Sequence, residues 1–519
     1  MIMMDLHCSA TVAGQYQSAF RAFGSRQALV DGSARWTYAE LAERCYRMVR
    51  YFESLGLARQ DGIALLAGND VDAVVVVIAA QLMGLRYTAL HPMGALEDQA
   101  FVLRDASIRL LVVDGKRFAE HGRELKALGI VETVLSLGAA DFGVDAVTAS
   151  ARFDGGEIPI DVQPHDVSKI SYTGGTTGRP KGVVQHQRTV LTMTLQQLAC
   201  WEWPEVTRML VTTPISHAGG SIMLPVFLRG GTLTLADRYK PELFLQVVQE
   251  QRITATFLVP TQIYGLLDCE ERSRYDVSSL QLVLYGAAPI APARLAEALK
   301  VFGPIFGQLY GQVEAPMAIS YLRKDEHQGE RLHSCGRALP GNDVRLLDRD
   351  LREVPVGEVG ELCVRSSLTM VGYLNRPEET AKALAGGWLH TGDVARADAQ
   401  GYLYLVDRAK DMIITGGFNV YSSEVEACLA LHASVAQSAV IGVPDAKWGE
   451  AVTAVVVLKP GQAKPTDKEL MHFVHEHKGP VIAPKAVVFA DTLPLTPLGK
   501  VDKKALRARF WQGQERQIG

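Results

Sequence analysis

The chain has 519 residues, too many for one ordinary hydrophobic core, so two or more domains are expected. With 48% hydrophobic and 21% charged residues, its composition is that of a globular protein. The net charge of −4, without a long basic or acidic run, argues against nucleic acid as a partner.

The beginning of the chain and its most apolar run predict a cytoplasmic protein without a membrane span. No basic stretch followed by an apolar one opens the sequence, so no secretory signal is expected. The run 74–85 includes Gln81 and is too short to cross a bilayer. The seven cysteines lack metal or disulfide spacing and are expected to be reduced thiols, most of them buried.

Short apolar runs that stop at Gly, Pro or Asn predict β-strands at 62–66, 211–213, 256–259 and 282–285. Helical patterns such as 292–302 lie between several of them. This alternation predicts an α/β fold with mostly parallel sheets flanked by helices. The run 74–80 allows two interpretations, since its valines favour a strand and its length favours a buried helix.

The pattern changes after about residue 408 to that of a smaller α+β unit. The segments 435–443 and 451–458 are typical of strands. We therefore predict a large N-terminal domain at 1–408 and a small C-terminal domain at 409–519.

Two capping-box patterns predict helix starts within this smaller unit. Ser423 is followed three residues later by Glu426, and Thr466 by Glu469. In such a box the hydroxyl and the carboxylate satisfy backbone N–H groups of the first helical turn.

The most informative segment, 171–183, contains four glycines, three threonines and one lysine. Glycine lets backbone N–H groups approach an anion, threonine adds hydroxyl donors and Lys181 adds a mobile positive charge. The segment therefore predicts a site for a nucleotide triphosphate. Pro180 and Gly182 on either side of the lysine favour a turn between extended segments, unlike the Walker loop, which opens into a helix.

Seven further segments are ordinary turns or loops when taken singly, and they gain weight from their order: 214–220, 286–289, 309–314, 391–393, 407–411, 415–419 and 493–503. With the loop 171–183 they resemble the adenylate-forming superfamily of acyl-CoA synthetases, luciferases and nonribosomal adenylation domains. The loop of that superfamily usually reads Tyr-Thr-Ser-Gly-Thr-Thr-Gly-x-Pro-Lys-Gly, and this chain departs from it only at Gly174. The resemblance covers nearly the whole chain and implies a small, mobile C-terminal domain joined at a hinge, matched by Lys410.

The resemblance implies an ATP site assembled from these segments. Lys181 and six loop residues would surround the β- and γ-phosphates. The six loop residues are Thr173, Gly174, Gly175, Thr176, Thr177 and Gly178. The small residues Gly286, Ala287 and Ala288 match the turn that binds adenine. Asp393 and Arg408 match contacts to the ribose, whose two vicinal hydroxyls suit a carboxylate.

The segment 309–314 resembles the Tyr-Gly-x-Thr-Glu motif of the superfamily. The resemblance implies that Tyr310 packs on adenine beside Gly311 and that Glu314 binds magnesium. Mg²⁺ prefers hard oxygen ligands and often takes one or two carboxylates beside phosphates and water, so a single glutamate is sufficient. Val313 replaces the usual threonine and removes a hydroxyl contact to the α-phosphate or the substrate carboxylate.

Two segments of the C-terminal domain match the two half-reactions of the superfamily. Lys500 matches the lysine that bridges carboxylate and α-phosphate during adenylation. For the thiol tunnel, the resemblance points to Gly416, Gly417, Phe418 and Trp448, although core packing explains Trp448 equally well. A solvated basic tail is the interpretation for Lys503, Lys504, Arg507 and Arg509.

These motifs predict an AMP-forming acid–CoA ligase, which uses ATP, Mg²⁺ and CoA to convert a carboxylic acid into its thioester through an acyl-adenylate. Two alternatives stay open: an enzyme that loads the acid onto a separate carrier protein, and a silent binding or regulatory member. Lys181, Glu314, Asp393 and Lys500 argue against the silent member. A homodimer is also left open.

The acid pocket is expected to be apolar and uncharged. By resemblance it is lined by His217, Ala218, Phe257, Leu309, Gly311, Pro316 and Met317, with His217 also placed beside the substrate carboxylate. Amino-acid-activating relatives carry an aspartate near this histidine, and none occurs between Thr212 and Arg229. We therefore expect aromatic, alicyclic or medium-chain monocarboxylates to be preferred over amino acids and dicarboxylates.

Overall fold

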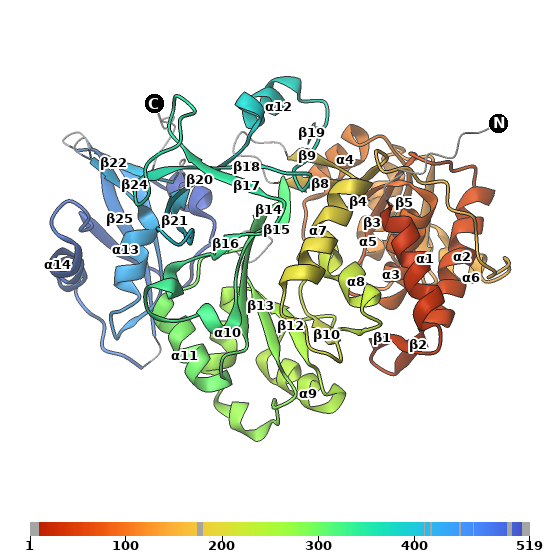
Figure 1. Ribbon diagram of the computed structural model, residues 1–519, viewed down its shortest axis with the longest axis horizontal. Helices are drawn as coiled ribbons and strands as arrows, with labels where there is room; N and C mark the ends of the chain where they lie inside the picture. Colours follow the sequence, from red (N-terminus) through yellow and green to blue (C-terminus); the bar gives the residue numbers. More distant parts are fainter. Residues whose placement is uncertain are drawn as a thin grey trace.

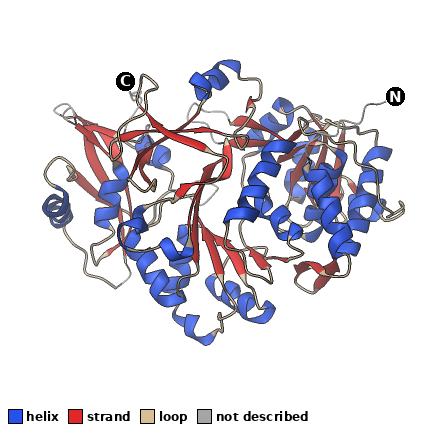
Figure 2. Ribbon diagram, viewed as in Figure 1, coloured by secondary structure: helices blue, strands red, loops and turns tan. Residues whose placement is uncertain are grey.

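The computed structural model describes residues 10–173, 180–408, 411–415, 418–445, 448–459, 461–495 and 501–510. Within these ranges the chain forms two large sheets, a smaller antiparallel sheet and a C-terminal sheet, with helices on their faces (Figures 1 and 2). The predicted α/β fold, with a large N-terminal part and a smaller C-terminal part, is confirmed. The boundary at 408/409 stays a prediction; β21 ends at Arg408.

The first large sheet is parallel from β1 through β14 and antiparallel at both ends. Its strands, in spatial order, are β16 (Arg337–Ala338), β15 (Ala315–Leu322), β14 (Phe306–Gln312), β13 (Leu282–Tyr285), β12 (Ala255–Leu258), β10 (Arg208–Val211), β11 (Thr232–Leu235), β1 (Gln27–Asp31) and β2 (Ala34–Thr37).

The second large sheet is also mostly parallel, and an antiparallel hairpin followed by a short strand closes one edge. Its strands, in spatial order, are β19 (Gly372–Tyr373), β9 (Lys181–His186), β8 (Val167–Thr173), β4 (Arg86–Ala89), β3 (Gly62–Leu66), β5 (Ile108–Asp114), β6 (Thr133–Leu137) and β7 (Val144–Asp145).

Helices between and around these sheets bury the largest hydrophobic cluster of the described residues. It joins side chains of both sheets with those of α1 (Val12–Phe23), α2 (Tyr38–Ser54), α3 (Val71–Met83), α7 (Gln187–Cys200) and α8 (Ala218–Leu228). The helix α6 (Ala146–Ser150) also packs against this cluster through Ala146 and Ala149. The outer faces are covered by α4 (Leu96–Asp105), α5 (Ala119–Ala127), α9 (Pro241–Gln251), α10 (Pro260–Asp268) and α11 (Pro292–Phe302). Burial of each large side chain, such as Phe52 or Phe227, is worth about 1.5–3 kcal/mol.

The antiparallel sheet consists of β17 (Asp343–Leu347), β18 (Val359–Arg365), β20 (Leu389–Ala397) and β21 (Leu403–Arg408), and α12 (Pro377–Ala383) precedes β20. The C-terminal sheet contains β23 (Phe418–Val420), β22 (Ile413–Thr415), β25 (Gly449–Leu458), β24 (Val435–Asp445) and β26 (Ala486–Phe489). It is accompanied by α13 (Ser422–Leu429), α14 (Asp467–Lys478) and α15 (Lys503–Ala508).

Most predicted elements occur within one or two residues of their expected bounds. The ambiguous run 74–80 lies inside the buried helix α3, whose N-cap is Asp70. The strand expected at 211–213 is instead β10, which ends at Val211, because the chain turns there into a loop. No described helix combines the length and apolar character that a membrane crossing requires.

One of the two predicted capping boxes is wrong. At α14, Thr466 accepts from the backbone N–H of Glu469, and the Glu469 carboxylate accepts from Thr466 N at 2.7 Å. At α13 the box is absent, because Ser423 Oγ donates to the carbonyl of Val406 and Glu426 is engaged elsewhere. Tertiary partners therefore replace the local cap at this helix.

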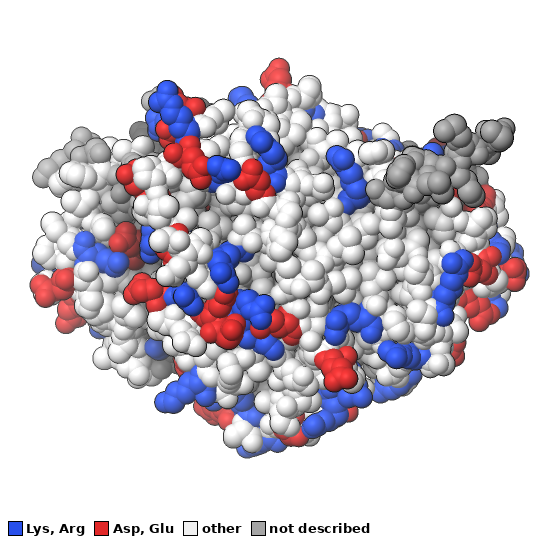
Figure 3. Space-filling view, viewed as in Figure 1, with Lys and Arg blue, Asp and Glu red and all other residues white. Residues whose placement is uncertain are grey.

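On the face shown in Figure 3, basic and acidic side chains are interspersed rather than gathered into a field of one sign. The described cysteines are free thiols, and all of them except the half-buried Cys200 are buried. The expectation of reduced, mostly buried thiols therefore holds for the described residues.

Candidate active site

The glycine-rich segment connects two antiparallel strands. Thr173 at the end of β8 is the ladder partner of Lys181 at the start of β9. The predicted extended segments on both sides of the loop are therefore confirmed. The loop residues Gly174, Gly175, Thr176, Thr177 and Gly178 lie outside the described residues.

Lys181 and Glu314 meet at a tyrosine that the sequence analysis did not predict. Tyr373 Oη donates a hydrogen bond of 2.8 Å to Glu314 Oε1, and Lys181 Nζ lies 5.2 Å from the centroid of the Tyr373 ring. Burial, and then the nearby Glu314 carboxylate, raise the pKa of Tyr373, so the phenol keeps its proton and remains a donor.

Strand pairing explains why these three residues meet. Tyr373 in β19 is the ladder partner of Val183 in β9, two residues beyond Lys181. The backbone N–H of Met370 donates to the carbonyl of Glu314 at 2.7 Å, which fixes the glutamate against the same edge. The short strand β19 carries no distinctive motif, and its pairing is a property of the fold.

The segment that carries Glu314 is also hydrogen-bonded to β9, the strand that follows the glycine-rich loop. Gln185 Nε2 on β9 donates to the carbonyl of Val313 at 2.5 Å. Gly311 lies where β14 and β15 pair irregularly, and a Cβ at this position would collide with the backbone of Met317. Met317 itself has φ of +54°, a conformation that costs a non-glycine residue about 1–3 kcal/mol.

The predicted adenine and ribose residues also come together. Tyr310 Oη donates to Asp393 Oδ2 at 2.6 Å, and both residues are buried. Burial and the adjacent Asp393 carboxylate raise the pKa of Tyr310 well above its usual value, which keeps the donor protonated. Asp393 on β20 is in turn the ladder partner of Arg408 on β21. The two residues predicted to contact the ribose therefore lie opposite each other on neighbouring strands.

The predicted adenine turn follows β13 directly and precedes α11, as expected. Gly286 is buried against the carbonyl of Leu309, where a Cβ would not fit. Ala287 is exposed and has φ of +65°, a second strained non-glycine position in a predicted ligand segment. Ala288 is partly exposed beside it.

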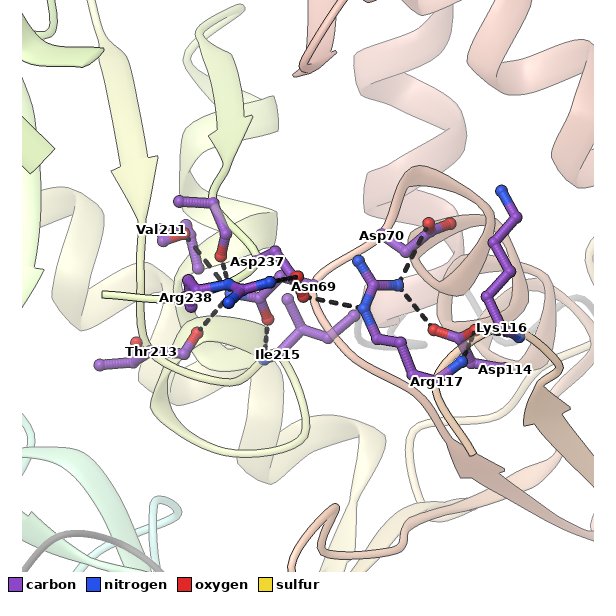
Figure 4. Close-up of polar contacts among 11 residues, drawn as sticks. Asn69, Asp70, Asp114, Lys116, Arg117, Val211, Thr213, Ile215, Asp237 and Arg238 are labelled. Atoms are coloured by element: carbon purple, nitrogen blue, oxygen red, sulfur yellow. Dashed lines mark hydrogen bonds and ion pairs between the residues drawn. The ribbon is translucent and has the colours of Figure 1, made fainter. Parts of the chain in front are cut away.

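A buried asparagine positions the loop that carries His217 (Figure 4). Asn69 Nδ2 donates to the carbonyl of Thr213 at 3.1 Å, and Asn69 Oδ1 accepts from the backbone N–H of Ile215 at 2.9 Å. The same amide donates to the carbonyl of Ala236 at 3.0 Å. Asn69 therefore holds the end of β10 and the following loop against the end of β3, a role that its sequence context did not signal.

An arginine beside Asn69 joins the two large sheets at the same ends of their strands (Figure 4). Arg117 forms ion pairs with Asp114 at 2.6 Å, with Asp237 at 2.8 Å and with Asp70 at 3.6 Å. Asp114 ends β5 and Asp237 follows β11, so this cluster fixes the relative position of the sheets that supply the site.

His217 is the N-cap residue of α8 and is half-buried beside a second histidine. Its ring centroid lies 4.9 Å from that of His91, and its Nδ1 lies 2.8 Å from Ser216 Oγ. Burial lowers the pKa of His91, which favours the neutral ring. Among the other predicted pocket residues, Ala218 opens α8, whereas Phe257, Leu309, Pro316 and Met317 are buried around the same core.

The described residues predicted to line a thiol tunnel flank one strand end of the C-terminal sheet. Thr415 on β22 is the ladder partner of Phe418 and of Gly449, the residue after Trp448. Phe418 is 60% exposed and Trp448 is 37% exposed, so core packing does not account for Trp448. Phe418 directly follows Gly416 and Gly417, which lie outside the described residues.

The basic residues of the C-terminal helix are not all solvated, which corrects the sequence interpretation. Lys503 Nζ forms an ion pair of 2.7 Å with Glu426 and donates to Ser422 Oγ at 2.6 Å. Arg507 pairs with Asp411. Because Glu426 and Asp411 are more than seventy residues away in the sequence, no local sequence pattern predicts these ion pairs. Lys504 and Arg509 are exposed, as expected.

Three further predictions concern residues that the structure does not describe fully. Lys500 and the hinge residue Lys410 lie outside the described residues, and so does the side chain of Arg408. Their assigned roles stay predictions.

The chain belongs to the AMP-binding enzyme family. The family model for AMP-binding enzymes matches residues 16–374, and the model for the AMP-binding enzyme C-terminal domain matches residues 424–500. The resemblance inferred from the motifs is therefore confirmed.

Named relatives and a solved structure extend this result. The chain is 45% identical over 515 residues to the medium/long-chain-fatty-acid–CoA ligase FadD8 of Mycobacterium tuberculosis (strain ATCC 25618 / H37Rv), covering 96% of this chain and 90% of FadD8. It is 35% identical to the feruloyl-CoA synthase of an Amycolatopsis species, covering 93% of this chain and 96% of that synthase. The structure of the amide bond synthetase McbA from Marinactinospora thermotolerans matches with a TM-score of 0.89 and 33% identity, covering 96% of this chain and 100% of McbA.

Proposed function

We propose that this protein is an AMP-forming acid–CoA ligase that adenylates a carboxylic acid with ATP and then transfers the acyl group to CoA. The observation that carries the proposal is the convergence of three distant motifs. Lys181 and Glu314 meet at Tyr373, while Tyr310 of the Glu314 segment binds Asp393. FadD8 and feruloyl-CoA synthase, both named as CoA-thioester-forming enzymes, support this activity.

The described side chains have the chemistry that adenylation requires. Lys181 offsets negative charge on the triphosphate, and Asp393 accepts hydrogen bonds from the ribose diol. Glu314 is a half-buried carboxylate, oriented by Tyr373, and is therefore a suitable hard-oxygen ligand for Mg²⁺. Bound there beside the phosphates, the ion would neutralise charge on the leaving pyrophosphate.

The proposed substrates are acids with an apolar body and no ammonium group. The segment 213–229 contains neither Asp nor Glu, and the predicted pocket residues Phe257, Leu309 and Met317 belong to the hydrophobic core. An aromatic, alicyclic or medium-chain body would gain roughly 25 cal/mol per Å² of apolar surface that it buries there.

We expect octanoate to exceed 2-aminooctanoate in kcat/KM by roughly 100-fold, because a buried ammonium without a carboxylate partner costs several kcal/mol. Pyrophosphate release, measured for a panel of acids with and without CoA, tests both the acid class and the acceptor. Preferred turnover of the amino acid would reveal an acidic pocket residue outside the predicted set. Pyrophosphate release without thioester formation for every acid would contradict the CoA ligase assignment.

Gly417→Leu is expected to block thioester formation while sparing adenylation. A leucine side chain in the proposed thiol path would displace the thiol, and a small displacement of a reacting group costs roughly 100-fold in rate. Single-turnover assays that follow acyl-adenylate and acyl-CoA separately measure this effect, with Gln462→Leu, at an exposed residue of a turn in the same domain, as the control. Wild-type rates in both steps would show that Gly417 does not line the path.

A further inference from the structure

A lysine in β8 occupies an unusual position on the inner face of the second large sheet. Lys169 is the ladder partner of Tyr87 on β4 and of Gln185 on β9. Cross-strand partners present their side chains on the same face, so these three residues form one row across the sheet. Tyr87 and Val183 belong to the hydrophobic core between the two large sheets, which identifies this face as the inner one.

The polar atoms of this row are not satisfied by the described residues. Tyr87 Oη and Gln185 Oε1 are buried without a hydrogen-bond partner, and the described residues supply no ion pair to Lys169. Tyr87 is 7% exposed and Gln185 is fully buried, so bulk water does not replace the missing partners. Burial lowers the pKa of Lys169 to about 8, as expected for an amine without a carboxylate nearby.

The row lies on strands that lead to the candidate active site. Lys169, Ser171 and Thr173 alternate onto the same face of β8 and each remains partly exposed, whereas Ser168 and Ile170 on the other face are buried. Thr173 leads directly into the glycine loop, roughly 13 Å from Lys169 along the strand. Gln185, beside Lys169, donates to the carbonyl of Val313, the residue before Glu314.

We infer that Lys169, Tyr87 and Gln185 form the far end of the acid pocket and bind an oxygen-bearing group at the distal end of the substrate. This inference rests on the proposed function. The ammonium of Lys169 and the hydroxyl of Tyr87 would donate to a ketone or carboxylate oxygen of the ligand, and Gln185 lies beside Lys169 in the same row. The pocket is thus apolar in its middle and polar at its end.

This assignment changes one expectation drawn from the sequence. The predicted pocket residues are all uncharged, and they led to the exclusion of acids with a second carboxylate. Lys169 was not recognised, because it precedes the glycine loop in an ordinary strand pattern and only the strand register brings it to this face. Amino acids remain disfavoured, because the predicted pocket residues offer no carboxylate partner to the ammonium group beside the reacting carboxylate.

The test compares matched acids that differ only at the distal end. The pairs are octanoate with octanedioate, and cyclohexanecarboxylate with 4-oxocyclohexanecarboxylate. In the wild-type enzyme we expect the oxygen-bearing member of at least one pair to have the higher kcat/KM. A preference for octanedioate alone identifies an anion subsite, and a preference for the ketone as well identifies a general oxygen acceptor subsite.

Lys169→Met should lower the ratio of kcat/KM between the preferred oxygen-bearing acid and its plain partner by roughly 10- to 100-fold, the usual effect of losing a charged hydrogen bond. Lys169→Arg, which keeps the charge, should retain part of the preference. Lys300→Met, the same change at an exposed lysine of α11, should leave the ratio unchanged.

Two outcomes would overturn the inference. The first is a wild-type enzyme that prefers the plain acid in both pairs. The second is a folded Lys169→Met enzyme with the wild-type ratio, which would mean that buried water alone satisfies the lysine. Neither outcome affects the proposed function, which fails separately if no acid in the panel yields a CoA thioester.

Discussion

Lys500→Ala is expected to abolish acyl-adenylate formation while sparing thioester formation from a pre-formed acyl-adenylate. The adenylation transition state gathers negative charge on the α-phosphate and the attacking carboxylate, and a preorganised cation there is worth roughly 100- to 1,000-fold in rate. The second half-reaction starts from the acyl-adenylate, in which the bond between the carboxylate and the α-phosphate has already formed. The lysine therefore has no comparable role in that step. Pyrophosphate exchange measures the first step, and acyl-CoA formation from synthetic acyl-adenylate measures the second.

The choice of control for this experiment comes from the structure. Lys504→Ala removes an exposed lysine of the same segment and should leave both half-reactions at wild-type rates. Lys503 is unsuitable as a control, because its ion pair with Glu426 and its bond to Ser422 hold α15 against α13. An equal loss of both half-reactions in Lys500→Ala would contradict the assignment.

The fold was largely predictable, because its signals are local. Apolar runs bounded by Gly and Pro identified β3 and β13 with their observed bounds, and the helical pattern identified α11. The pattern of α3 was ambiguous, since a helix that is buried all round lacks the amphipathic period that separates helix from strand. The capping box predicted at α13 does not form, because Ser423 and Glu426 bind residues distant in the sequence instead of the first turn of the helix.

The candidate site was predictable only as far as motifs reach. Motif order selected Lys181, Glu314, Tyr310 and Asp393 as candidates, but it contained no information on which of them touch. The residues that position parts of the site lack a motif: Tyr373 contacts Glu314 from a two-residue strand, and Asn69 holds the loop before His217 by donating to carbonyls of another sheet. The substrate contact proposed for Lys169 depends likewise on strand register. Each is an ordinary residue in sequence whose role arises from long-range strand pairing or from a turn of the backbone.

Glu314→Gln is expected to reduce adenylation by roughly 100-fold or more and to raise the Mg²⁺ concentration needed for half-maximal rate. The amide keeps the size of the side chain and can still accept the hydrogen bond from Tyr373 Oη, so the local packing is preserved. What it loses is the anionic oxygen that Mg²⁺ prefers, and with it the charge balance at the phosphates. Thioester formation from pre-formed acyl-adenylate should be much less affected.

Tyr373→Phe is the matched variant that separates the metal role of Glu314 from a packing role. It removes the 2.8 Å hydrogen bond but keeps both the aromatic ring beside Lys181 and the carboxylate. We therefore expect a smaller rate loss than in Glu314→Gln, because Glu314 keeps its charge and loses only its orientation. Rates measured across a Mg²⁺ titration distinguish the two variants. If Glu314→Gln kept the wild-type Mg²⁺ dependence while Tyr373→Phe lost activity, Glu314 would be a structural acceptor for Tyr373 and the metal would be held elsewhere.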